Sequence, residues 1–253
     1  MNLKQKLKNK KTVIGSWITL AHPIIPEIMA GAGFDFLVIE MEHSVISLKD
    51  TQVLIQSIQA QGVAPLVRLG ENDPNLIKRV MDAGAEGVII AFVNSAADAK
   101  KAVDAVKYPP VGTRGVGLAR AQKYGFGFEA YKKWAKDDSL VIALIEHIRA
   151  VENLESILSV PGLDGTLIGP YDLSGSLGYP GEFERPEVRK AMDRYESICK
   201  KMKKPMGFHV VHPDAAKVLE KKKKGYRFLA VGLDTLYLGT KCREVVSGLR
   251  AKR

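Results

Sequence analysis

Short apolar runs alternate with longer amphipathic stretches along the whole chain. The apolar runs predict eight β-strands: Val13–Leu20, Phe36–Glu42, Pro65–Leu69, Gly87–Phe92, Leu140–Glu146, Gly165–Gly169, Met206–Val210 and Arg227–Gly232. Helical patterns lie between them, among them Leu48–Gln61, Pro74–Ala83, Ala96–Val106, Pro186–Lys203 and Asp214–Lys223. Strands that are hydrophobic along their whole length are buried on both faces, so the pattern predicts a parallel sheet covered by helices.

The number of these strand–helix units favours a closed barrel. Eight strands in 253 residues fit a (β/α)8 TIM barrel better than an open, doubly wound sheet. No Gly-x-Gly-x-x-Gly motif opens a helix after the first strand, which disfavours a dinucleotide-binding fold. We therefore predict an α/β protein with a single barrel domain over residues 1–253, in which the C-terminal helical region, residues 234–253, takes part in oligomer contacts.

One connection is much longer than the others. Residues 108–139 contain Pro109-Pro110, five glycines and the arginines Arg114 and Arg120. Long glycine-rich loops inside a compact domain are usually functional or disordered. We predict that this segment is a functional loop.

Composition excludes several classes of protein. Hydrophobic residues make up 46% and charged residues 26% of the chain, as in soluble globular proteins, and no apolar run reaches the ~18 residues that span a bilayer. Residues 1–11 are polar and lysine-rich, unlike a secretory signal. Two cysteines, Cys199 and Cys242, provide neither a disulfide framework nor a zinc motif. A cytoplasmic protein with no membrane partner is expected.

The net charge of +10 is concentrated in four segments: residues 1–11, 200–204, 221–224 and 241–253. Together they carry 18 basic residues and one acid, so the rest of the chain has a net charge of −7. Basic residues at helix ends complement the helix dipole, and the clusters lack the aromatic residues of an RNA-binding surface. We predict solvated helix ends and no nucleic-acid partner.

Reactive side chains stand where the predicted strands end. These residues are Glu40, Glu42 and His43 after the second strand, Arg68 in the third, Glu146 and His147 in the fifth, and Tyr171 and Asp172 after the sixth. In a TIM barrel the active site lies at the carboxyl ends of the strands. The sequence therefore predicts one site at the mouth of the barrel.

Glu146 and Asp172 belong to adjacent strands, so their carboxylates can meet above the barrel. Two negative charges that lie close together need a shared proton or a cation. Carboxylates without cysteine form a hard oxygen site, which suits Mg²⁺ or Mn²⁺. Alternation along the strand turns His147 away from this face, so we expect His147 to be structural.

Two further residues could handle protons and negative charge. His43 is preceded by Glu40 and Glu42, and a carboxylate beside an imidazole keeps it basic. Arg68 emerges from an apolar strand and needs an anion, which is either a partner carboxylate or an oxyanion formed during a reaction.

Several motifs together resemble the HpcH/HpaI aldolase family. They are Ile145-Glu146-His147-Ile148-Arg149-Ala150-Val151-Glu152-Asn153-Leu154, Gly169-Pro170-Tyr171-Asp172-Leu173-Ser174, the Glu42-His43 pair, Arg68, and Arg114-Gly115-Val116-Gly117 followed by Arg120-Ala121. The resemblance covers nearly the full chain, with the motifs in the family's order and spacing.

This resemblance implies a class II pyruvate aldolase, an aldehyde-lyase that forms or cleaves 4-hydroxy-2-oxo acids from pyruvate and an aldehyde through a metal-bound enolate. It implies that Glu146 and Asp172 bind the divalent metal (Mg²⁺, Mn²⁺ or Co²⁺). It also implies a homohexamer built as a trimer of dimers. Related 2-keto-3-deoxy sugar acid and 4-hydroxy-2-oxoheptanedioate aldolases belong to the same family.

The resemblance also assigns the remaining site residues. The peptide N–H groups around Gly169 to Tyr171 are expected to bind the pyruvate carboxylate, and Arg68 the developing oxyanion. His43, oriented by Glu40, is expected to move protons. Trp17 is expected to line the mouth, and the loop with Arg114 and Arg120 to border it, Arg120 as a substrate-binding residue. The family usually has Asp in place of Glu40, and some members have a polar residue in place of Leu144.

Two other functions remain open at this stage. One is a related lyase acting on acyl-CoA thioesters, of the citramalyl or malyl type, and the other is a non-catalytic anion-binding barrel. No predicted strand ends in lysine, which disfavours a Schiff-base aldolase. Asp234, after the last strand, stands where barrels often bind phosphate and disfavours phosphorylated substrates.

Overall fold

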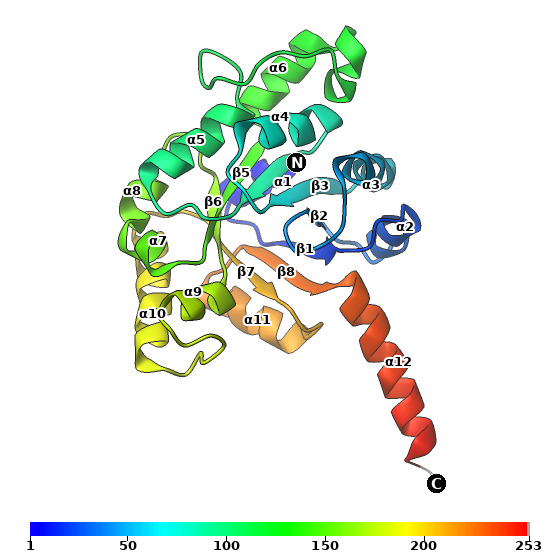
Figure 1. Cartoon of the computed structure of the whole chain (residues 1–253), viewed down its shortest axis with the longest axis vertical. Helices are drawn as coiled ribbons and strands as arrows, with labels where there is room; N and C mark the ends of the chain where they lie inside the picture. Colours follow the sequence, from blue (N-terminus) through cyan, green and yellow to red (C-terminus); the bar gives the residue numbers. More distant parts are fainter. Residues whose placement is uncertain (252–253) are drawn as a thin grey trace.

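The computed structural model describes residues 1–251, which form a closed barrel of eight parallel strands (Figure 1). The strands are β1 (Val13–Ile18), β2 (Phe36–Glu40), β3 (Ala64–Leu69), β4 (Gly87–Ile90), β5 (Leu140–Ile145), β6 (Gly165–Ile168), β7 (Met206–Val210) and β8 (Phe228–Leu233). Each strand pairs with its neighbour in sequence, and β8 closes the barrel against β1. The predicted TIM barrel is confirmed.

Helices surround the barrel. They are α1 (Leu3–Lys8), α2 (Ile24–Ala30), α3 (Leu48–Ala60), α4 (Pro74–Ala83), α5 (Ala96–Val106), α6 (Phe128–Asp137), α7 (Ile148–Glu152), α8 (Leu154–Leu158), α9 (Pro170–Ser176), α10 (Pro186–Lys201), α11 (Ala215–Lys224) and α12 (Asp234–Arg250). A short 3-10 segment, η1 (Arg120–Gly125), precedes α6. None of the helices within residues 1–251 is long and apolar enough to cross a membrane.

Alternation along the strands divides the buried residues into two sets. Inward-facing side chains such as Val38, Leu66 and Ile142 fill the barrel, where Phe36 stacks on Phe228 with ring centroids 4.5 Å apart. Gly15 makes room for this stack, because a Cβ there would lie 2.4 Å from the Phe36 ring. The barrel is therefore a packed core beneath its mouth.

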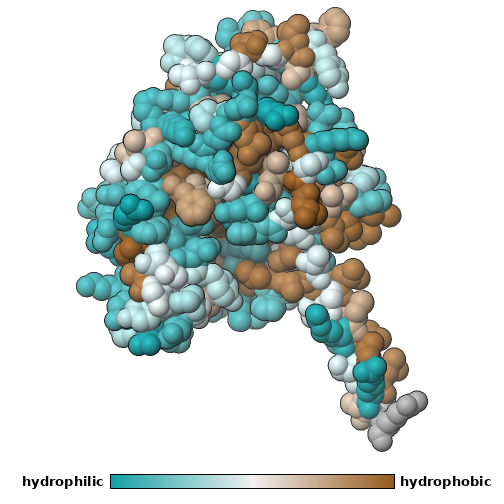
Figure 2. Space-filling view, in the orientation of Figure 1, coloured by the Kyte–Doolittle hydropathy of each residue, from teal (hydrophilic) through white to brown (hydrophobic). Residues whose placement is uncertain are grey.

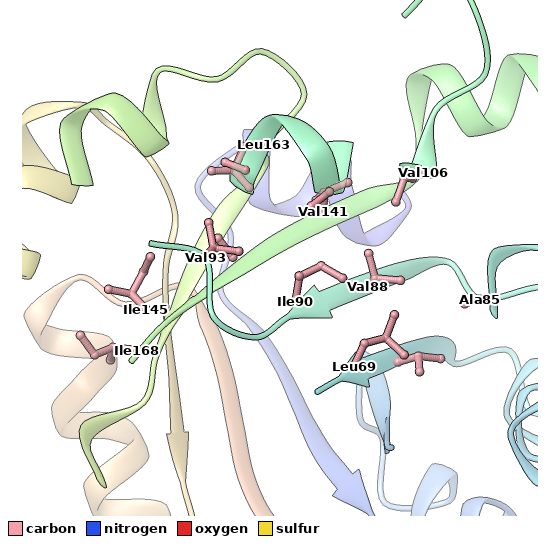
Figure 3. Packing of buried hydrophobic residues seen from close by; sticks show 14 of the residues in the cluster. Leu69, Ala85, Val88, Ile90, Val93, Val106, Val141, Ile145, Leu163 and Ile168 are labelled. Atoms are coloured by element: carbon pink, nitrogen blue, oxygen red, sulfur yellow. The ribbon is translucent and has the colours of Figure 1, made fainter. Parts of the chain in front are cut away.

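Outward-facing side chains form the larger hydrophobic layer between strands and helices. Figure 3 shows part of it, where Val88 and Ile90 of β4 and Val141 and Ile145 of β5 belong to the same cluster as Val106 of α5. All five are fully buried. This layer fixes the strands, and hence the residues at their ends.

Two segments differ from the sequence-based expectation. Residues 108–139, predicted as one loop, contain η1 and α6, and the buried Arg114 anchors the loop by an ion pair with Asp82 and hydrogen bonds to the Tyr131 hydroxyl. The lysine-rich N-terminus forms α1, whose Leu3 and Leu7 pack into the interior cluster at the amino-terminal end of the barrel. Tertiary contacts, rather than local periodicity, order both segments.

The last helix extends away from the barrel (Figure 1). α12 contacts β8 and β1 near its start, whereas residues 241–250 are all exposed. Hydrophobic side chains lie along it in the space-filling view (Figure 2). The exposed hydrophobic residues of α12 are Leu238, Val245, Val246 and Leu249. The helix that follows the eighth strand, α12, therefore extends away from its own barrel instead of covering it.

Candidate active site

The alternation that fills the barrel also selects the residues of its mouth. Trp17, Glu40 and Arg68 are inward-facing positions at the carboxyl ends of β1, β2 and β3, and Glu146 directly follows β5 in the same alternation. Each stands above a layer of buried apolar side chains, such as Leu144 below Glu146. Four strands thus deliver four functional groups to one point.

A cavity of about 1020 Å³ opens at this end of the barrel. Eight of the nine site residues predicted from sequence line it: Trp17, Glu40, His43, Arg68, Glu146, Gly169, Tyr171 and Asp172. The ninth, Arg120, does not line it. The structure therefore brings eight of the predicted residues together in one cavity, while their contacts differ from expectation in several details.

Arg68 is held by two carboxylates. Its Nε donates to Glu40 Oε2 at 2.7 Å, and its Nη1 forms an ion pair with Glu42. The guanidinium carbon also lies 5.2 Å from the centre of the Trp17 ring. These contacts leave Nη2 without a partner among residues 1–251. Arg68 is therefore rigidly oriented and keeps one free donor edge.

Glu40 orients the backbone rather than the imidazole of His43. Its Oε1 accepts hydrogen bonds from the backbone N–H groups of Glu42 at 2.7 Å and His43 at 3.0 Å. The His43 side chain is 69% exposed, and its nearest carboxylate oxygen, at 3.9 Å from Nε2, belongs to Glu42. The expected Glu40–imidazole contact is thus absent from the described residues, because the Glu40 carboxylate is occupied by Arg68 and the turn after β2.

Glu42 has contacts in the site that the sequence argument did not predict, since it gave Glu42 only the role of keeping His43 basic. Its side chain is largely buried, and it joins Arg68 to the acidic part of the mouth. Burial raises the pKa of Glu42, and the charge of Arg68 acts in the opposite direction. Its position between Glu40 and His43 was the available indication in the sequence, but the sequence argument used it only to support a basic His43.

Glu146 is a deeply buried acid of the mouth, at 5% exposure. Its Oε1 accepts a hydrogen bond of 2.8 Å from the Phe92 backbone N–H, which lowers its pKa. Burial acts more strongly, and with the negative charges of Glu42 and Asp172 it raises the pKa of Glu146 to about 7. A buried carboxyl that competes with two other acids favours a nearby cation.

Asp172 lies in the first turn of α9 and faces the same cavity. Gly169 gives Glu146 the room to approach, since a Cβ at Gly169 would lie 3.1 Å from the Glu146 Cβ. The Gly169 N–H donates to the Ile145 carbonyl at 3.0 Å and is therefore not free to bind an anion, contrary to expectation. The N–H groups of Tyr171 and Asp172 have no helical acceptor, because they belong to the first turn.

The donor set fits a hard divalent cation. Glu146 and Asp172 supply carboxylate oxygens, and no cluster of three or more His, Cys, Asp or Glu able to hold a metal ion occurs in the described part of the chain. Mg²⁺ commonly binds through one or two carboxylates and fills its other positions with water and substrate. Two protein ligands and a wide cavity match that coordination.

Trp17 and His209 form one wall of the mouth. Their rings stack with centroids 5.0 Å apart, and His209 Nε2 lies 3.0 Å from the Gly232 carbonyl. Burial lowers the pKa of His209 to about 4, so the ring is neutral at pH 7. The buried Trp17 Nε1–H has no acceptor within residues 1–251. His209 was missed because it stands inside β7, away from any reactive motif.

The remaining predicted residues lie away from the mouth or support its loops. Arg120 donates to Gln59 Oε1 at 2.8 Å and to the Ala83 carbonyl at 3.0 Å, where α3 and α4 end, at the opposite end of the barrel. Its role in substrate binding stays a prediction, because within one chain Arg120 lies too far from the mouth to contact a substrate there. His147 caps α7, its Nδ1 accepting from the Arg149 N–H at 3.1 Å, as the structural interpretation predicts.

Asp234 ties the loop after β1 to the start of α12. Its carboxylate accepts hydrogen bonds from the backbone N–H groups of Thr19 and Leu20, both at 2.8 Å, and from the Thr19 hydroxyl at 2.6 Å. This carboxylate occupies the position that phosphate takes in many barrels. The expectation that the site disfavours phosphorylated substrates stays a prediction.

Known proteins resemble this chain over almost its whole length. It is 36% identical to the 2-dehydro-3,6-dideoxy-6-sulfogluconate aldolase of Pseudomonas putida, over 98% of this chain and 96% of that protein. It is 37% identical to the 2-keto-3-deoxy-L-rhamnonate aldolase of Klebsiella pneumoniae, over 92% and 87%. The crystal structure of an HpcH/HpaI aldolase from Desulfitobacterium hafniense superposes with a TM-score of 0.91 at 32% identity, over 99% and 97%.

One family model matches most of the chain. It is described as HpcH/HpaI aldolase/citrate lyase and matches residues 13–239, from the start of β1 into α12. The chain is therefore an aldolase, a carbon–carbon lyase, and belongs to the HpcH/HpaI aldolase/citrate lyase family.

Proposed function

We propose that this enzyme joins pyruvate to an aldehyde, and cleaves the resulting 4-hydroxy-2-oxo acid, with a divalent metal held by Glu146 and Asp172. The observation that carries the proposal is the excess of carboxylates at the mouth. Glu40, Glu146 and Asp172 line one cavity with Arg68, Glu42 forms an ion pair with Arg68, and burial raises the pKa of Glu146 to about 7. A cation relieves this repulsion.

A bound divalent ion supplies Lewis acidity, which makes the methyl protons of pyruvate easier to remove. The ion is Mg²⁺, Mn²⁺ or Co²⁺, as expected of the family. The aldolase alternative that uses a lysine Schiff base has no support at the mouth. The lysines that line the cavity, Lys217, Lys221 and Lys224, belong to α11 outside the barrel.

The chain's own groups bind and orient the substrate. The free Nη2 edge of Arg68 faces oxygen atoms of pyruvate and of the aldehyde, and the Trp17 ring lies beside it. The Tyr171 and Asp172 N–H groups bind the pyruvate carboxylate. His43, exposed at the rim, exchanges protons with water that reaches the reacting carbon. Glu40 holds Arg68 and the turn that carries His43, and is therefore a positioning residue.

The aldehyde is expected to be small and hydroxylated, and to come from a 2-keto-3-deoxy acid. This choice is supported by the names of the two relatives, which act on 2-keto-3-deoxy-L-rhamnonate and on a sulfonated 2-dehydro-3-deoxy acid. The wide mixed-charge wall formed by α10 and α11, with Arg189, Lys217 and Glu220, leaves room for such a polar chain.

Proton exchange separates this function from a binding protein. Pyruvate in deuterium oxide with Mg²⁺ or Mn²⁺ should lose its methyl proton signal when the enzyme is added, and chelator should stop the loss. A panel of hydroxy-aldehydes, scored by product mass, then identifies the acceptor. No exchange and no product with any aldehyde would contradict the proposal. Borohydride with pyruvate should leave the protein mass unchanged.

We also propose a homo-oligomer in which α12 packs on a second copy of this chain. The outward-facing Ile14 of β1 is 37% exposed, and Ile24 and Ile28 on the neighbouring α2 are 50% and 67% exposed. In a TIM barrel the helix after the eighth strand normally covers this face. Here that helix is α12, which instead presents the apolar residues Val246 and Leu249 to solvent. A reciprocal exchange of α12 buries both surfaces, and dimers so formed assemble into the hexamer expected of the family.

Light scattering after gel filtration tests this assembly. Val246→Glu on α12 and Ile28→Glu on α2 should each lower the molar mass from that of the oligomer to that of smaller species. A monomeric native protein would contradict the proposal.

The free cysteines Cys199 and Cys242 also support the expected cytoplasmic location.

A further inference from the structure

Two of the four basic segments of the sequence, residues 1–11 and 200–204, meet at the end of the barrel opposite the catalytic mouth. A cleft of about 470 Å³ lies there between α1, the end of α10 and the turn before β8. Seven basic side chains line it with a single carboxylate, Asp164: they are Lys4, Lys8, Lys10, Lys200, Lys203, Lys204 and Arg227. The chain thus brings together three segments that are far apart in sequence and carry the same charge.

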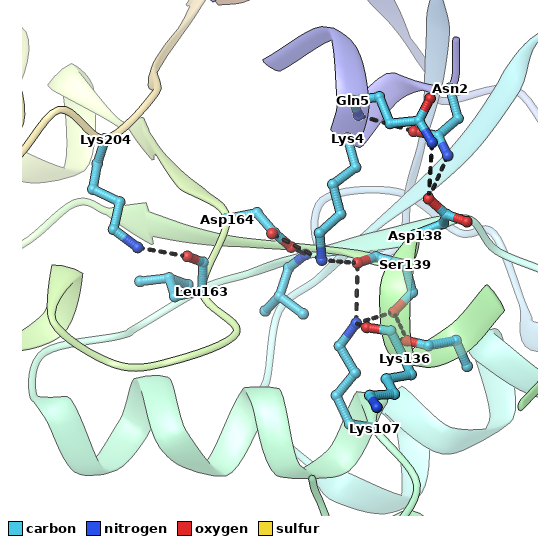
Figure 4. Close-up of polar contacts among 12 residues, drawn as sticks. Asn2, Lys4, Gln5, Lys107, Lys136, Asp138, Ser139, Leu163, Asp164 and Lys204 are labelled. Carbon is cyan, nitrogen blue, oxygen red and sulfur yellow. Dashed lines mark hydrogen bonds and ion pairs between the residues drawn. The ribbon is translucent and has the colours of Figure 1, made fainter. Parts of the chain in front are cut away.

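Only some of these cations have partners. Lys4 forms an ion pair with Asp164 at 3.0 Å, and Lys204 donates to the Leu163 carbonyl at 3.0 Å, as Figure 4 shows. Lys200 lies 3.3 Å from Glu196 on its own helix. Lys8, Lys10 and Lys203 have no ion pair with any residue of the described chain, positions 1–251. The uncompensated charge therefore lies on the rim of the cleft.

Two of the unpaired lysines occupy backbone positions that favour glycine. Lys10 follows α1 with φ +56° and Lys203 follows α10 with φ +55°. Both helices end in a Schellman-type motif, with Lys11 N–H bonded to the Lys6 carbonyl and Lys204 N–H to the Cys199 carbonyl. Glycine fills the equivalent left-handed position after α4 and α11 in the same chain.

Lysine at such a position costs backbone free energy that glycine does not. Lysine stands at both positions, one on each side of the cleft. A requirement for positive charge there, to bind an anion, explains this choice of residue. Beneath the rim the floor is apolar, with Leu7, Leu163 and Met206 each 3% exposed. A compact, highly charged anion therefore meets cations on at least two sides.

We propose that this cleft binds a small polyphosphate anion, either a free oligophosphate or the phosphate chain of a nucleotide. Phosphate oxygens accept several hydrogen bonds at once from lysine and arginine, and such charge-assisted bonds are the strongest in proteins. Lys8, Lys10 and Lys203 contact the phosphates from the two sides, and Arg227 contacts them from the turn before β8. A nucleotide would add contact between its base and the apolar floor.

Calorimetric titration of the full-length protein in chelator tests this site with three probes: ATP, tripolyphosphate and adenosine. ATP or tripolyphosphate should bind saturably, and adenosine should not compete. Tighter binding of ATP identifies a nucleotide, and equal binding identifies the phosphate chain alone as the ligand. The absence of saturable binding of both anions, or equal binding of adenosine, would overturn the proposal.

Paired variants show whether the binding occurs in the cleft. Lys10→Gln with Lys203→Gln should weaken the anion about tenfold or more, because two charge-assisted contacts are lost. Lys222→Gln with Lys223→Gln removes the same charge from the exposed face of α11, outside the cleft, and should change affinity much less. Equal weakening in the two variants, or none in the first, would assign the anion to general attraction or to the catalytic mouth.

A second variant excludes loss of folding as the cause. Lys10→Gly with Lys203→Gly replaces both left-handed lysines with the residue that this conformation favours, so the melting temperature should stay the same or rise. Anion affinity should nevertheless fall as in the glutamine variant. A more stable protein that still bound the anion normally would overturn the proposal.

Discussion

The two ends of the barrel carry opposite charges under similar constraints. At the mouth, Glu42 and Glu146 are buried beside Arg68, and burial raises the pKa of Glu146 to about 7. At the amino-terminal end, burial and, to a lesser extent, the nearby charge of Lys4 lower the pKa of Lys107 to about 7. At both ends, therefore, burial and a neighbouring like charge shift the pKa of a buried group toward its neutral form.

The two ends differ in how the charge is satisfied. The Lys107 ammonium has protein partners: the Ala135 carbonyl at 2.7 Å, the Ser139 hydroxyl at 2.6 Å and the Lys136 carbonyl at 3.1 Å (Figure 4). Glu146 has one backbone donor, and its second oxygen faces the cavity with Asp172. A buried charge closed by the protein is structural, whereas one left open toward a cavity is a site for a ligand.

Removing the carboxylate of Asp172, which faces the cavity with Glu146, should have the largest effect on the proposed ligand site. Asp172→Asn keeps the shape of the side chain but removes one charge, so metal affinity should fall steeply and turnover by about 10³-fold or more, since the metal supplies several kcal/mol. Calorimetric titration with Mn²⁺, with and without pyruvate, measures the affinity. Chelator should abolish the activity of the native enzyme, and Mg²⁺, Mn²⁺ or Co²⁺ should restore it. Equal metal affinity in both proteins would remove Asp172 from the site.

Arg68→Lys should have the next largest effect. Lysine keeps the charge but lacks the planar fork, in which separate nitrogens hold Glu40 and Glu42 while a third faces the substrate. Turnover should fall about 10²-fold, the scale of one lost oxyanion donor. Arg79→Lys is a matched control, because Arg79 is exposed on α4 and does not line the cavity, and its turnover should stay close to native. Near-native activity of Arg68→Lys would make Arg68 an ion-pair residue only.

The fold and the location of the site were predictable because both follow from local patterns. Continuous apolar runs gave the strands, and the ends of α4 and α5 agree with their predicted bounds, where a proline, a glycine or a serine cap marks the change. Alternation placed Glu146 inward and His147 outward, as observed. Regular periodicity carries this information without knowledge of the rest of the chain.

The contacts of the site were less predictable because they depend on side-chain reach and on distant segments. Glu40 and Arg68 lie opposite each other on the paired strands β2 and β3. The sequence does not give this register, which is known only from the folded barrel. The Gly-rich loop was expected at the mouth, yet Arg114 is fixed by Asp82 and Tyr131 on the outside. A short helix such as α1, which depends on burial of Leu3 and Leu7, has no strong local signal either.

The opposite pKa shifts predict opposite pH dependences of stability, first at the mouth. In the metal-free protein the folded pKa of Glu146 is raised from 4.5 to about 7, so its proton stabilises the folded state at low pH. That contribution should be lost as pH rises through about 7, with a slope of at most about 1.4 kcal/mol per pH unit for one proton. Urea unfolding in chelator measures the slope. Glu146→Gln should flatten the profile, and an unchanged profile would contradict the shift.

At the amino-terminal end the slope should have the opposite sign and be smaller. The folded pKa of Lys107 is lowered from 10.5 to about 7, so the unfolded chain binds more protons than the folded one between these values. Stability should therefore rise with pH above about 7 and fall as pH drops through about 7. The hydrogen bonds from Lys107 to the end of α6 favour the charged form and reduce the slope below that of a full proton. Lys107→Met keeps the length of the side chain but cannot titrate, and its urea-unfolding profile between pH 7 and 9 should be flatter than that of the native protein. The two profiles would coincide if Lys107 stays fully charged across this range.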